Sequence, residues 1–133
     1  MKKYLVLCLS AIMLTACVGH NRLECAEHER NAKSPVYFKF NSLQPTTASK
    51  ARLKDGLIYL TGHRFKKVQL EGYSDAQGGN TWYNIDLSRR RAEKVRDIMV
   101  EGGVAEKRIN VDWHGVQQGL PYRMYRRVDV TIK

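Results

Sequence analysis

Three consecutive arginines at positions 89–91 are the residues best placed for specific binding chemistry in this 133-residue sequence. Apolar side chains lie four positions before Arg91 and four and seven positions after it, namely Leu87, Val95 and Ile98. This spacing is typical of the buried stripe of a helix. Arg91 lies on the stripe, whereas Arg89 and Arg90 are rotated away from it by about 200° and 100°. A guanidinium on a buried stripe is partly desolvated and needs a carboxylate partner. Arg91 is therefore the candidate binding residue, and its two neighbours are expected to form a solvated basic face.

The elements that must position Arg91 follow from the hydrophobic periodicity. Alternation with a period of two predicts strands, and apolar residues three and four positions apart predict helices. In chain order we expect a strand at 35–41, a helix at 47–60, a strand at 67–73, a polar loop at 74–82, a helix at 84–101, and strands at 108–113 and 127–132. This β-α-β-α-β-β order predicts an α/β (α+β) two-layer sandwich, with the helices packed on one face of a mixed sheet.

The beginning of the chain has the pattern of an export signal. A basic segment at 1–3 is followed by a mainly apolar run of eleven residues at 4–14. This is a signal peptide pattern, and the run is shorter than the roughly 20 residues of a membrane-spanning helix. The run ends in Leu14-Thr15-Ala16-Cys17, which resembles the lipobox of bacterial lipoproteins and implies a lipid on Cys17. The alternative is a soluble secreted protein with a cysteine near an ordinary cleavage site. We expect a signal peptide at 1–16, a lipidated N-terminus and flexible tether at 17–33, and one domain at 34–133.

The remaining cysteine and the net charge suggest partners. Cys8 leaves with the signal peptide and Cys17 carries lipid, so Cys25 is left for an intermolecular disulfide or as a buried or reactive thiol. The formal charge is +10, which predicts an anionic partner. Nucleic acid is not expected, because the periplasm offers little of it. Residue Val18 is not the Asp that retains such lipoproteins at the inner membrane, so the outer membrane is the expected location.

Several short motifs occur in the order found in one known family. They are Gly72-Tyr73-Ser74-Asp75, Gly78, Tyr83-Asn84, Leu87-Ser88, Arg91-Ala92 and Arg126-Arg127-Val128. Over residues 34–133 the sequence thus resembles the OmpA-like peptidoglycan-binding domains, a group that includes the Pal lipoproteins. In that family, an Asp after the second strand and an Arg in the following helix hold the free end of diaminopimelate in the peptide stem of peptidoglycan. The resemblance implies these roles for Asp75 and Arg91.

The chemistry of the ligand fits these two residue types. The free end of diaminopimelate carries an ammonium and a carboxylate close together, and a receptor for it needs one fixed anion and one fork-shaped cation. Asp accepts from the ammonium, whereas Arg offers paired donors to the carboxylate. The resemblance adds Phe40 and Asn41 at the end of the first strand, with Phe38 in the core. The backbone N–H groups near Gly78 are further candidates.

Other arrangements of the same residues remain open. Arg91 and Asp75 form a purely structural salt bridge in one of them. Arg127 is expected either to approach the ligand, to orient Asp75, or to pair with Asp129. The stretch from Asp75 to the Tyr-Asn pair is one residue longer than is usual in the family, which alters the loop at 78–82.

The sequence also limits the classes of function. It contains no paired-histidine metal motif, P-loop or nucleophile elbow, so we expect neither an enzyme nor a bound cofactor or metal. The expected function is non-catalytic binding of peptidoglycan by a periplasmic domain that tethers the outer membrane to the cell wall. The alternative is a lipoprotein docking subunit of a secretion or conjugation machine, which uses the same fold to contact protein partners in an envelope complex.

Overall fold

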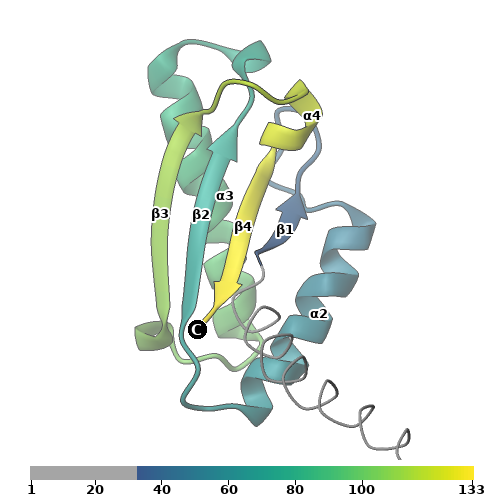
Figure 1. The fold of residues 1–133 in the computed structure, drawn as a ribbon, viewed down its shortest axis with the longest axis vertical. Helices are drawn as coiled ribbons and strands as arrows, with labels where there is room; N and C mark the ends of the chain where they lie inside the picture. Colours follow the sequence, from purple (N-terminus) through teal and green to yellow (C-terminus); the bar gives the residue numbers. More distant parts are fainter. Residues whose placement is uncertain (1–32) are drawn as a thin grey trace, which may run out of the picture. The chain divides into compact units, whose positions relative to one another are not determined.

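A four-stranded mixed sheet lies at the centre of the computed structural model, which describes residues 33–133 (Figure 1). The strands are β1 (Ser34–Tyr37), β2 (Val68–Ser74), β3 (Ile109–Val116) and β4 (Arg127–Ile132), in the order β1-β4-β2-β3. Strand β2 is parallel to β3 and antiparallel to β4, and β1 is antiparallel to β4. The carboxyl ends of β1, β2 and β3 therefore share one edge of the sheet. The predicted mixed sheet is confirmed.

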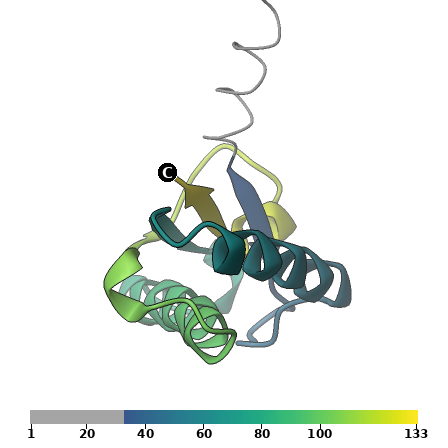
Figure 2. The ribbon, with the colours of Figure 1, turned by 90° about the horizontal axis from the view of Figure 1, so that it is seen from below.

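Two long helices, α2 (Thr47–Gly62) and α3 (Thr81–Glu101), lie on the same side of the sheet (Figure 2). The apolar side chains between helices and sheet form the core: Val36, Phe38, Leu53, Leu60, Val68, Leu70, Ala92, Val95, Met99, Val104, Ile109, Val128 and Val130. The described residues thus form a compact unit that contains its own core. The predicted two-layer α+β sandwich is confirmed, because one layer of helices covers one face of the sheet.

Both helices begin at a polar cap. The Thr46 hydroxyl accepts from the Ser49 amide at 3.3 Å before α2, and the Asn80 side chain accepts from the Tyr83 amide at 2.9 Å before α3. Asn is among the preferred N-cap residues because its side-chain oxygen satisfies a free N–H of the first turn. The expected start of α3 at residue 84 was three residues late, since the apolar stripe begins only after this first turn.

The first strand is shorter than expected. It ends at Tyr37, after which Phe38 makes one isolated bridge to Pro45, and Asn41 has a φ of 45°. Asn tolerates this left-handed conformation better than most residues, and the chain turns there toward α2. Three short helices were not expected: η1 (Ala76–Gly78), η2 (Glu106–Arg108) and α4 (Tyr122–Tyr125).

A close approach at Gly72 brings α3 against β2. A Cβ atom on Gly72 would lie 2.2 Å from the carbonyl oxygen of Ser88, so only glycine fits. Beside this contact, the Ser74 hydroxyl donates to the Asn84 carbonyl at 2.9 Å, and the Gly115 amide donates to the Ser88 hydroxyl at 3.0 Å. These contacts fix the first turns of α3 beside the carboxyl end of β2.

Several expectations concern residues before position 33. The signal peptide at 1–16, the tether at 17–33 apart from its last residue, the lipid on Cys17 and the thiol of Cys25 lie outside the described residues. Within residues 33–133, none of the helices has both the length and the apolar character that crossing a bilayer requires.

Candidate functional site

Asp75 directly follows β2 at the edge of the sheet where β1, β2 and β3 end. Its side chain is buried, with a residue exposure of only 2%. The carboxylate makes no capping bond to η1. Instead, Arg126 Nη1 donates to Asp75 Oδ2 at 2.9 Å. A buried carboxylate requires such a partner because its removal from water is costly.

Arg91 is fully buried, as the helical stripe predicts. Its guanidinium donates to three backbone carbonyls: Nε to Ser42 at 3.2 Å, Nη1 to Tyr73 at 3.3 Å and Nη2 to Lys39 at 3.4 Å. The guanidinium also lies 5.4 Å from the centroid of the Phe38 ring. Burial lowers the pKa of Arg91 to about 10, while the charge of Asp75 acts in the opposite direction. Arg91 therefore remains a cation at neutral pH and joins the loop after β1 to the end of β2.

Arg91 and Asp75 are neighbours but not an ion pair. Among the described residues, the only ion pair of Asp75 within 4.0 Å is with Arg126, so the alternative of a structural Arg91–Asp75 salt bridge is wrong. The charge of Asp75 nevertheless raises the pKa of Arg91, and the charge of Arg126 lowers it. Two guanidinium groups thus surround one carboxylate, and the cluster has an excess of positive charge.

The loop after β1 lies against this cluster. The Phe40 ring is 55% exposed and lies 5.9 Å from the Arg126 guanidinium, whereas Phe38 is buried in the core. The hydroxyl of Tyr83, in the first turn of α3, donates to the side-chain oxygen of Asn41. The structure therefore brings Phe40 and Asn41 to the same edge as Asp75, as expected from the sequence.

The turn that contains Gly78 follows Asp75 in the sequence and leads to the start of α3. The short helix η1 directly follows Asp75 and ends at Gly78. The next residue, Gly79, has a φ of 141°. The side-chain nitrogen of Asn84 donates to the Gly79 carbonyl at 3.1 Å. In the described part of the chain, two buried polar side-chain atoms lack a partner: Asn84 Oδ1, an acceptor, and Arg126 Nε, a donor. Buried polar atoms are almost always hydrogen-bonded, so these two atoms are an unusual feature. Arg126 contacts Asp75 itself, and Asn84 contacts Ser74 and Gly79, which lie on either side of Asp75 in the sequence.

Arg127 does not join the cluster. Its Nε donates to Asp129 Oδ1 at 2.8 Å, its Nη1 donates to the Met124 carbonyl at 2.8 Å, and its guanidinium lies 4.5 Å from the centroid of the Tyr73 ring. Of the expected arrangements, the structure shows the pair with Asp129. The ion-pair partner of Asp75 is Arg126, which sequence reasoning missed although it forms part of the same motif.

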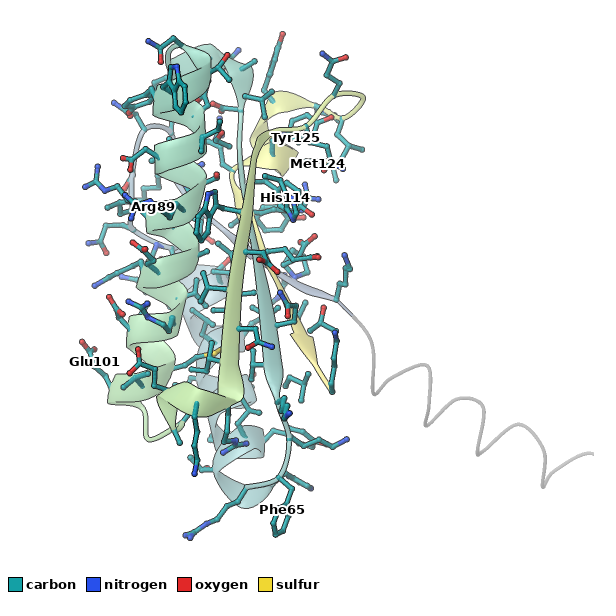
Figure 3. The ribbon with its side chains drawn as sticks, turned by 90° about the vertical axis from the view of Figure 1, so that its left-hand side faces the viewer. Phe65, Arg89, Glu101, His114, Met124 and Tyr125 are labelled. Carbon is teal, nitrogen blue, oxygen red and sulfur yellow. The ribbon has the colours of Figure 1, made fainter. Side chains whose placement is uncertain are left out.

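The other two arginines of the run at 89–91 face away from this site. Arg89 pairs with Asp86 at 2.6 Å and with Glu93 at 3.2 Å on the outer face of the helix, and Figure 3 shows its side chain directed away from the sheet. Arg90 is exposed. The expected solvated basic face is confirmed. Among the described residues there is no group of three or more His, Cys, Asp or Glu side chains placed to hold a metal ion.

Comparisons with known proteins identify the class. Residues 37–123 match the model of the OmpA family, and the chain belongs to this family. It is 31% identical to the "Peptidoglycan-associated lipoprotein" of Buchnera aphidicola over 60% of this chain and 46% of that protein. It is 33% identical to "Outer membrane protein 40" of Porphyromonas gingivalis over 64% of this chain and 22% of that protein. The chain thus spans less than half the length of these relatives.

Solved structures show the same fold. The crystal structure of the peptidoglycan-associated lipoprotein from Burkholderia pseudomallei has a TM-score of 0.68 and 26% identity, and it covers 74% of this chain and 89% of its own. The OmpA-like domain of FopA1 from Francisella tularensis has a TM-score of 0.64 at 19% identity, with 74% of this chain and 72% of its own covered. The latter likeness concerns the fold alone.

Proposed function

We propose that this protein binds the peptide stem of peptidoglycan without catalysis and tethers the outer membrane to the cell wall. The names of two relatives, each called a peptidoglycan-associated lipoprotein, support the association with peptidoglycan. The observation that carries the proposal is the cluster of buried Asp75, buried Arg91 and half-buried Arg126, which combines one fixed anion with two fixed cations. Such an arrangement suits a ligand that is itself a zwitterion.

In the proposed complex, the free end of diaminopimelate lies between these charges. Arg126 contacts only Oδ2 of Asp75, so Oδ1 accepts from the ligand ammonium together with the unpaired Oδ1 of Asn84. The unpaired Nε of Arg126 donates to the ligand carboxylate. A guanidinium has five N–H donors, and the backbone carbonyls take three of those of Arg91. The remaining two are available to the same carboxylate.

The loops complete the proposed pocket. Phe40 and Asn41 supply one wall, and the turn at Gly78 supplies backbone N–H groups on the other side, where the start of α3 favours an anion. In this arrangement Arg91 has two roles, because it holds the loop after β1 in place and contributes positive charge.

The proposed attachment to the membrane rests on the sequence alone. A lipid on Cys17 would hold the protein in the outer membrane, with the domain in the periplasm. The segment at 17–33 would span at most about 55–60 Å when fully extended, so the domain works close to its membrane.

Co-sedimentation of the protein with purified peptidoglycan sacculi tests the proposal. The parent protein is expected to sediment with sacculi, and Asp75→Asn is expected to lower retention by at least about tenfold, because charge-assisted hydrogen bonds are among the stronger contacts in proteins. Asp86→Asn, which removes an exposed carboxylate of α3, is the matched control and should retain binding.

Competition identifies the ligand group. Soluble diaminopimelate should displace the protein from sacculi, whereas lysine with its α-amino group acetylated and its α-carboxyl group amidated should not, because its side-chain ammonium has no carboxylate beside it. Retention that survives both Asp75→Asn and Arg91→Lys in folded variants would contradict the proposed site. Failure of the parent protein to bind sacculi would overturn the function.

A further inference from the structure

The turn between α2 and β2 presents an aromatic ring to solvent. Phe65 is fully exposed, and it lies between Arg64 and the lysines Lys66 and Lys67 (Figure 3). A single exposed apolar residue is common on protein surfaces. This one differs from the common case in three respects, which are its rigid support, the charge around it and its position in the domain.

Arg108 stabilises the turn by donating hydrogen bonds to backbone carbonyls. Its Nε donates to the Lys66 carbonyl at 2.7 Å, and its Nη2 donates to the carbonyls of His63 at 2.8 Å and Leu60 at 3.2 Å. The backbone of Lys67 pairs with that of Lys133 in both directions, at 3.0 and 2.9 Å. These hydrogen bonds fix the backbone of the turn that carries Phe65. Little backbone conformational entropy would therefore be lost when a partner contacts the ring.

The surroundings of Phe65 are basic. A shallow hollow beside the ring is lined by Gly62, His63, Arg64, Phe65, Lys66 and Lys133. At this end of the domain, six basic side chains stand against two acidic ones, Glu101 and Glu106; the basic ones are Arg64, Lys66, Lys67, Lys107, Arg108 and Lys133. An aromatic ring surrounded by basic side chains is complementary to a surface that has negatively charged groups on the outside and an apolar layer beneath them.

The chain enters the domain nearer the end that carries Phe65 than the end that carries Asp75. Ser34, the first residue of β1, is in register with Val130, and Val130 with Leu70, which lies two residues after the start of β2 and four before its end. Figure 1 shows that β1 starts part of the way along the sheet and runs away from the Phe65 turn, toward the carboxyl end of β2. Asp75 lies at that end. If the lipid anchor of the proposed function is present, its tether joins the domain nearer the Phe65 turn than the edge with Asp75, so the Phe65 end faces the membrane; this step alone rests on the proposed function.

We propose that the Phe65 turn is a membrane-docking surface for a bilayer that contains anionic phospholipids. The Phe65 ring enters the boundary between headgroups and acyl chains, and Arg64, Lys66 and Lys67 bind the lipid phosphates. Docking of this turn leaves the edge with Asp75 directed away from the bilayer.

Vesicle co-sedimentation of the segment 33–133 tests this proposal without any lipid on the protein, since the segment contains its own core. The probes are vesicles of phosphatidylethanolamine with phosphatidylglycerol, compared with vesicles of phosphatidylcholine alone. Binding is expected only to the anionic vesicles. Phe65→Ser should lower the partition coefficient by about tenfold, because the ring no longer enters the interface. Arg64→Gln should lower it by about fivefold.

Matched variants at the opposite end provide the control. Trp82→Ser removes another exposed aromatic side chain, in the first turn of α3, and should leave vesicle binding unchanged. Phe65→Trp should preserve binding and add a blue-shifted emission component when anionic vesicles are mixed in, relative to the parent protein. This gain of signal does not depend on comparing losses among variants.

Several outcomes would overturn the docking surface. They are equal binding to neutral vesicles, full binding by Phe65→Ser, an equal loss in Trp82→Ser, or no vesicle binding by the parent segment; the last would leave a protein partner as the occupant of the turn. The two proposals fail separately, because Asp75→Asn should keep vesicle binding and Phe65→Ser in the full chain should keep sacculus retention.

Discussion

The molecule contains two runs of consecutive arginines, residues 89–91 in α3 and residues 126–127 at the junction of α4 and β4. The side chains of the two runs differ in where they point and in what they contact. In the helix each residue turns by about 100° relative to the one before, so Arg91 enters the core while Arg90 remains in solvent. At the start of β4, Arg126 reaches Asp75 and Arg127 reaches Asp129. The helical run therefore gives one buried cation beside an exposed one, whereas both cations of the second run are half-buried and pair with buried carboxylates.

The two runs also differ in what satisfies the buried cations. Arg91 donates to three neutral carbonyls, whereas Arg126 and Arg127 each pair with a carboxylate. Carbonyl dipoles satisfy the hydrogen-bonding capacity of a guanidinium without cancelling its charge. Arg91 therefore keeps a net charge inside the domain, next to the candidate site, and this charge remains available to an anionic ligand.

The largest expected effect separates Arg91 from Arg90. Arg91→Ala removes a fully buried side chain and leaves three carbonyls without their donor, so the free energy of unfolding should fall by about 4 kcal/mol. Arg90→Ala should change it by less than about 0.5 kcal/mol. Urea unfolding followed by circular dichroism measures both. Similar losses of stability for the two variants would contradict the assignment of Arg91 to the core and of Arg90 to the solvent.

The second test separates stability from binding at the start of β4. Arg126→Gln removes the ion-pair partner of buried Asp75, and Arg127→Gln does the same to Asp129; the side-chain exposures of these two carboxylates are 3% and 9%. Each variant should lose about 3 kcal/mol of stability. Only Arg126→Gln should lose retention on sacculi. Equal loss of retention would mean that binding depends on the stability of the sheet and not on the Asp75 cluster.

A smaller effect is expected for the exposed pairs of Arg89. Arg89→Ala breaks contacts with Asp86 and Glu93, whose side chains are both partly exposed to solvent. The urea midpoint should shift less than for any of the buried arginines. The difference from the parent protein should disappear in high salt, because salt screens exposed charges. A loss that persists in high salt would indicate a packing role for this side chain.

The smallest effect is expected for an exposed pair outside both runs. Lys33 Nζ lies 2.7 Å from Glu71 Oε2, and the hydrogen bond from Lys33 lowers the pKa of Glu71 below its ordinary value of 4.5. The pair should contribute about 0.5 kcal/mol. Since the folded-state pKa is depressed, this stability is present above pH 4.5 and is lost as the pH falls through the lower folded value. Glu71→Gln should not show this step in a pH series of urea midpoints.

The contrast between the runs also explains how far the sequence predicted the site. The helical period placed Arg91 correctly because its stripe is long and regular, and β4 was predicted at its observed bounds. Arg126 was missed because it follows the four-residue helix α4, which has no sequence signature, so the direction of the first side chain before β4 was not fixed. That Asp75 would pair with Arg126 and not Arg91 depends on tertiary packing, which periodicity does not describe.

The antiparallel pairing of β1 with β4 has a mechanical consequence. The chain enters the domain at the start of β1, whereas Asp75 and the loop fastened by Arg91 lie beyond the opposite ends of the strands. In the proposed function the membrane pulls on Lys33 and the wall pulls on the candidate site, so the force would run along β1. Interstrand hydrogen bonds of antiparallel pairs lie perpendicular to the strands. All four register pairs, from Ser34–Val130 to Tyr37–Arg127, are then loaded together in shear and are not peeled apart one by one.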